Sequence, residues 1–70
     1  KVTKEQRENL RKRFLSISGT MDCRVVDRNG KSIAEYDAFT HTVEIDEAIA
    51  ARAPPELIEY LFDYFSLISQ

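Results

Sequence analysis

The C-terminal segment of this 70-residue chain is apolar around most of its circumference, and this constrains the fold more than any other feature. Pro54 and Pro55 introduce the segment, and proline suits the first turn of a helix because N–H groups there lack intrahelical partners anyway. The pattern predicts a helix from about Pro55 to Ser69. Placed about 100° apart, its apolar side chains cover an arc of roughly 220°.

An apolar arc this wide exceeds what a helix needs to pack against one sheet, which is somewhat more than about 100°. Either the N-terminal helix covers the second side, or the surplus surface forms a homodimer or binds a protein partner. Aromatic side chains dominate such interfaces because they bury large areas at low entropic cost. The expected interface residues are Tyr60, Phe62, Tyr64 and Phe65.

The N-terminal segment predicts a second helix, from Lys4 to about Ser18. Thr3 and Gln6 have the spacing of a capping box, in which each side chain accepts a hydrogen bond from the backbone N–H of the other residue. Apolar residues recur at helical spacing and form a narrow stripe. They are Leu10, Phe14 and Ile17.

Asn29 and Gly30 form the dipeptide preferred in two-residue hairpin turns, where both positions need positive φ. The expected register places Cys23 opposite Tyr36 and pairs Arg24 with Glu35. One face of this hairpin then turns toward the core. That face carries Cys23, Val25, Ala34 and Tyr36.

Alternating residues predict a third strand from Thr40 to Asp46, followed by a short helical segment from Glu47 to Arg52. The resulting order is α-β-β-β-α. We therefore expect residues 1–70 to form a single small α+β domain. Its three-stranded antiparallel sheet would pack against an N-terminal and a C-terminal helix.

Charge is unevenly distributed along the chain: residues 1–31 carry a net charge of +5, and residues 32–70 carry −7. The two halves could attract each other within the fold, or one half could meet a charged partner. The order of elements is also that of double-stranded-RNA-binding domains, although APPELIEY replaces the lysine-rich start of their last helix. Nucleic-acid binding is therefore the alternative function. Its contacts would be Lys4, Arg7, Arg11, Lys12 and Arg13.

The segment VEIDEAIAARAPPELIEYLFDYF, about a third of the chain, resembles the strand and helix that precede zinc binding in some small zincin peptidases. In those enzymes a proline pair and ELIEYV lead into HExxH on the same helix. The matching positions here are Tyr64, Phe65 and Ile68, so both histidines and the glutamate are absent. The resemblance thus carries over neither zinc binding nor peptidase activity.

Other residues give little indication of catalysis. His41 has no serine and acid at suitable spacing, and Cys23 lies in a strand expected to face the core. We expect no enzyme activity, metal, cofactor or small-molecule substrate. One cysteine and no apolar run of membrane-spanning length favour a cytoplasmic protein without a membrane segment. The sequence therefore predicts a non-enzymatic protein–protein interaction module in the class of small regulators or inhibitors that self-associates or docks through its C-terminal helix.

Overall fold

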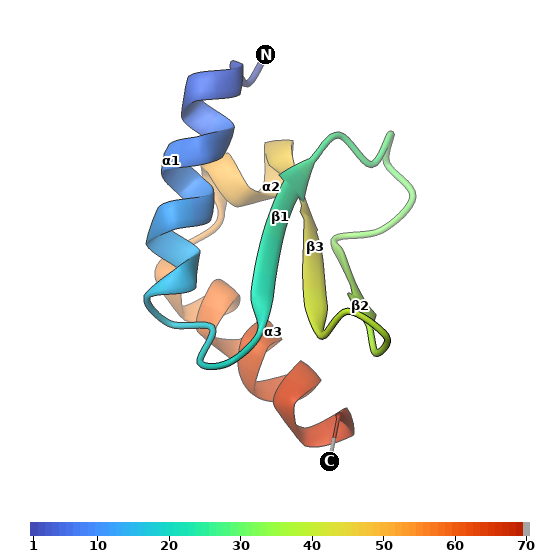
Figure 1. The fold of residues 1–70 in the computed structure, drawn as a ribbon. Helices are drawn as coiled ribbons and strands as arrows, with labels where there is room; N and C mark the ends of the chain where they lie inside the picture. The colour runs from blue at the N-terminus through green and yellow to red at the C-terminus, as the bar shows by residue number, and fades with distance from the viewer. Residues whose placement is uncertain (70) are drawn as a thin grey trace.

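The structure, a computed structural model, describes residues 1–69 and has the α+β class expected from the sequence. Figure 1 shows a small sheet with α1 along one side and α3 running beneath and behind it. The elements in chain order are α1 (Lys4–Leu15), β1 (Asp22–Val26), β2 (Ala34–Asp37), β3 (Thr42–Asp46), α2 (Glu47–Arg52) and α3 (Pro55–Ile68).

The sheet is mixed rather than antiparallel, and in this respect the prediction was wrong. Its strand order is β1-β3-β2: β3 lies in the centre, parallel to β1 and antiparallel to β2. The predicted register fails with it, because Cys23 pairs with Val43 and Arg24 pairs with Glu44. The central strand is also the most deeply buried, since Val43 and Ile45 are both fully enclosed.

The turn at Asn29 and Gly30 forms as expected but does not join paired strands. Both residues have positive φ, 54° and 72°, and Lys31 N donates to the Arg28 carbonyl at 3.1 Å. This hydrogen bond closes the turn within the loop itself, without any pairing of the flanking segments. It therefore leaves both flanking segments free to pair with β3, whose Asp46 N donates to the Ile33 carbonyl at 2.9 Å.

The expected core face of the sheet is confirmed even though the register is not. Cys23 and Tyr36 both pair with Val43, one from each side, so all three side chains occupy one row. Successive side chains point to opposite faces of a strand. Inserting β3 between the two predicted partners therefore leaves each on the face that the sequence assigned to it.

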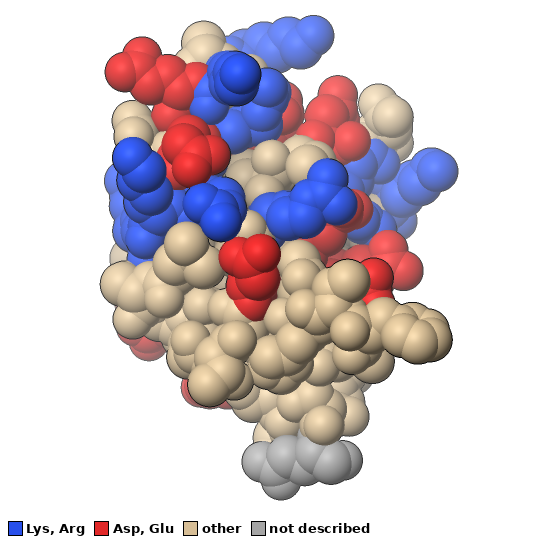
Figure 2. All heavy atoms as spheres, in the orientation of Figure 1, with Lys and Arg blue, Asp and Glu red and all other residues tan. Residues whose placement is uncertain are grey.

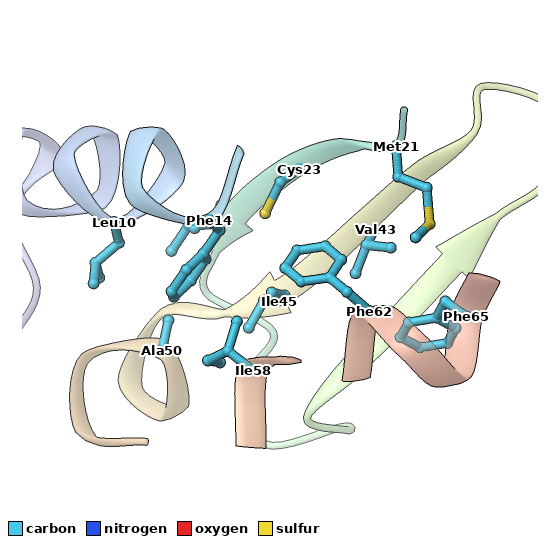
Figure 3. Packing of buried hydrophobic residues seen from close by; sticks show 11 residues of the cluster. Leu10, Phe14, Met21, Cys23, Val43, Ile45, Ala50, Ile58, Phe62 and Phe65 are labelled. Carbon is cyan, nitrogen blue, oxygen red and sulfur yellow. The ribbon is translucent and has the colours of Figure 1, made fainter. Parts of the chain in front are cut away.

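The core lies between this sheet face and the three helices (Figure 3). Phe14 of α1 meets Phe62 of α3 edge to face, with ring centroids 6.5 Å apart, and Phe65 stacks on Tyr36 at 5.9 Å. The buried apolar residues are Leu10, Phe14, Met21, Cys23, Val25, Val43, Ile45, Ala50, Ile58, Phe62 and Phe65. Aromatic pairs thus attach α3 both to α1 and to the edge strand β2.

The ends of two elements differ from expectation by a few residues. The capping box of Thr3 and Gln6 is confirmed, with both hydrogen bonds present, but α1 ends at Leu15 rather than Ser18. β3 begins at Thr42 rather than Thr40, because His41 has a φ of 53° and cannot continue a strand.

Candidate interaction surface

The four aromatic residues expected to contact a partner lie on two different sides of α3. Phe62 and Phe65 are buried in the core, with 2% and 8% of their surfaces exposed. Tyr60 and Tyr64 are 64% and 49% exposed. Only the two tyrosines of the predicted set are therefore presented to the outside in this fold.

Two further apolar side chains accompany the tyrosines. Leu67 is 69% exposed and Ile68 is 54% exposed. With spacings of three, four and seven residues, they share one side of the helix with the tyrosines. We call this surface the outer face of α3. It consists of Tyr60, Tyr64, Leu67 and Ile68.

An acidic border runs along one flank of the outer face. Glu56 and Asp63 lie one turn before and after Tyr60, and Glu59 adjoins them, all three being exposed. None of them joins an ion pair within the described part of the chain. The sequence from Ala53 onward contains no lysine or arginine. The border is therefore acidic with no neutralising partner on its own helix.

Sequence reasoning missed a further exposed aromatic residue, Phe39, at the turn between β2 and β3. The Asp37 carboxylate accepts a hydrogen bond from the Phe39 N–H at 2.9 Å, which holds the turn while the ring remains fully exposed. Figure 1 places this turn at the same end of the sheet as the C-terminal half of α3. The signal was available: Phe39 lies between residues typical of turns rather than within an alternating strand.

Charged and uncharged surfaces separate in the view of Figure 2. Basic and acidic side chains gather over the upper part of this face, and the lower part, over α3 and the lower ends of the strands, is almost entirely uncharged.

The basic residues expected to contact nucleic acid do not form one free surface. The Arg7 guanidinium donates to Glu47 Oε1 at 3.0 Å. Arg11 donates to the Cys23 carbonyl at 3.1 Å and also pairs with Glu8 and Asp22. The remaining three side chains are exposed. They are Lys4, Lys12 and Arg13. The two arginines with internal acidic partners are therefore less available to phosphates.

Asp46 is the most heavily bonded carboxylate in the fold. Only 8% exposed, it accepts hydrogen bonds from the N–H groups of Arg28, Ala48 and Ile49 at 3.0–3.1 Å. The bond from the Arg28 N–H is the main cause of a lowered Asp46 pKa, and the N–H groups of α2 add to it. This carboxylate has a structural role, joining β3, α2 and the loop before β2.

The surroundings of Cys23 and His41 indicate that both side chains support the fold rather than a reaction. Burial raises the pKa of the Cys23 thiol to about 12, with the Asp22 charge contributing, so the reactive thiolate is suppressed. His41 Nδ1 lies 2.7 Å from the Tyr36 hydroxyl, and its Nε2 lies 3.0 Å from Thr20 Oγ1. Both ring nitrogens therefore connect neighbouring segments.

The three positions that match the zincin ligands have packing or surface roles. Phe65 belongs to the core, while Tyr64 and Ile68 belong to the outer face of α3. Within residues 1–69, no three His, Cys, Asp or Glu side chains are grouped so that they could hold a metal ion. No helix in the same range is long and apolar enough to cross a membrane.

Comparison with known proteins returned no matching family model, curated protein or solved structure. The functional argument therefore rests on the surface geometry described above.

Proposed function

We propose that this chain is a non-enzymatic protein–protein interaction module that binds its partner through the outer face of α3. One observation carries the proposal: α3 already fills the core with Ile58, Phe62 and Phe65, yet its opposite side is apolar too. A helix with only a packing role normally turns polar residues outward. Large exposed apolar surfaces typically mark interaction sites.

A small regulator or inhibitor of a larger cytoplasmic protein needs such a surface and no reactive group. The aromatic side chains of Tyr60 and Tyr64 suit this role, because tyrosine is enriched among the residues that dominate binding energy. Nucleic-acid binding is less well supported, since Arg7 and Arg11 are engaged with acidic side chains of their own chain.

Site-specific photo-cross-linking in the native host tests the proposal. Benzoylphenylalanine in place of Tyr64 is expected to give a discrete adduct, and the same probe in place of Lys12, exposed on α1, is not. Leu67→Glu should remove the Tyr64 adduct without unfolding the chain, because Leu67 lies outside the core.

Sedimentation of the purified chain then distinguishes a homodimer from a complex with another protein. A monomer at high concentration together with a discrete heavier adduct indicates a different protein as partner. A monomer that also gives no adduct from the Tyr64 position overturns the proposal.

A further inference from the structure

We infer that the partner presents an apolar helical segment bordered by lysine or arginine residues, a basic amphipathic helix of another protein. This inference rests on the proposed function and adds the chemistry of the partner. It follows from what surrounds the outer face of α3 rather than from the apolar face alone.

Charge complementarity is the first argument. Glu56, Glu59 and Asp63 border the outer face along one flank, and each is exposed and outside the ion pairs of residues 1–69. A partner that covers the outer face would place its own flanking side chains close to these carboxylates. A basic flank gains from that approach, whereas an acidic flank is repelled.

The same charges argue against an antiparallel pairing of α3 with α3 of a second copy of the chain. In a twofold-symmetric pair of antiparallel α3 helices, the two acidic borders would lie side by side. No lysine or arginine follows Arg52 in the sequence to offset them. An anionic lipid surface meets the same repulsion.

The shape of the outer face indicates a helix. α3 contains 14 residues and is therefore about 21 Å long. Its exposed apolar side chains recur at positions 60, 64, 67 and 68, the spacing through which one helix packs against another. A partner helix of about four turns, with apolar residues at matching intervals, would cover this face along its length.

A pair of synthetic peptides tests the inference directly. The first is a labelled amphipathic helix of about 18 residues made of leucine and lysine, and the second replaces every lysine with glutamate. Measured by fluorescence anisotropy, the leucine–lysine peptide is expected to bind at least about tenfold more tightly than its acidic twin. Raising the salt concentration should weaken this binding, because the charges are exposed.

Two variants locate the binding site. Glu59→Lys with Asp63→Lys reverses the border and should weaken binding of the leucine–lysine peptide about tenfold. Glu5→Lys with Glu8→Lys makes the same change in net charge on α1 and serves as the matched control. Its binding should stay near that of the unmodified chain, and circular dichroism confirms that both variants are folded.

Each outcome bears on the inference separately from the proposed function. Equal weakening by the border variant and the α1 control would reveal attraction to net charge alone and overturn the inference. Failure of the basic peptide to bind better than its acidic twin overturns it as well. If the Tyr64 adduct in the host persists in either case, the interaction function stands and only the partner's chemistry is wrong.

Discussion

Asp46 connects three segments of the chain through two carboxylate oxygens. One oxygen accepts the Arg28 N–H, and the other accepts the first N–H groups of α2 from Ala48 and Ile49. Its own N–H donates to the Ile33 carbonyl. The residue thus begins a helix and also holds the loop that separates β1 from β2.

Replacing Asp46 with alanine removes the cap of α2 and leaves the Arg28 N–H without its partner. We expect unfolding to become easier by roughly 2 kcal/mol at pH 7, measured by urea denaturation. Asp63→Ala, at an exposed carboxylate outside any ion pair of residues 1–69, should have little effect.

The Asp46 contribution should also depend on pH. Because its pKa is lowered in the folded chain, the stabilisation is complete above the unfolded value of about 3.9 and is lost as the pH falls below it. The difference between Asp46→Ala and the unmodified chain should therefore shrink in strongly acidic urea titrations. A difference that is unchanged under those conditions would contradict the assigned role.

Among the elements, α3 carries apolar side chains on two different sides. Its inner side packs Phe62 against Phe14, and its outer side carries Tyr60 and Leu67. The N-terminal helix α1 shows no such division. In α1, the exposed positions around Leu10 and Phe14 are mostly charged or polar.

Substitutions on the inner side of α3 should lower the stability of the chain, whereas substitutions on its outer side should hardly change it. Phe62→Leu alters a tightly packed aromatic contact and should lower the free energy of unfolding by about 1–2 kcal/mol. Tyr60→Ala removes a mostly exposed ring and should change it by no more than about 0.5 kcal/mol. Thermal denaturation of both variants checks this. A larger loss from Tyr60→Ala would mean that α3 is rotated relative to the structure.

Over the whole molecule, ion pairs join the basic first half of the chain to the acidic second half. Each of them links residues at least seven positions apart. These pairs are Arg7–Glu47, Arg24–Glu44, Arg28–Glu35 and Arg28–Glu44. The charge asymmetry of the sequence is therefore used in part inside the fold, and the surplus acidic charge of α3 remains on the surface.

The pair between Arg7 and Glu47 should be structural, since only 7% of the Glu47 side chain is exposed. Arg7→Ala leaves a nearly buried carboxylate without its partner and should cost about 1–3 kcal/mol. Adding Glu47→Gln should recover part of that loss in a double-mutant cycle. Lys4→Ala, at an exposed position of the same helix, is the control. Equal effects from Lys4→Ala and Arg7→Ala in urea unfolding would refute the structural role.

The α+β class, the helices and the core face of the sheet could be predicted because each depends on local patterns. Alternation placed Cys23 and Tyr36 on the buried face, and the Thr3–Gln6 spacing located the start of α1. The turn at Asn29 and Gly30 also formed, since both residue types readily adopt the positive φ that it needs.

The strand order and the division of α3 depend on contacts between segments that are distant in the sequence. β3 lies between β1 and β2, where Val43 and Ile45 are fully buried in the centre of the sheet. No local turn signal encodes this strand order. The wide apolar arc of α3 likewise showed only that the helix has more apolar surface than packing against one sheet requires. Packing against Phe14 and Tyr36 selected Phe62 and Phe65 for the core and left Tyr60 and Tyr64 outside.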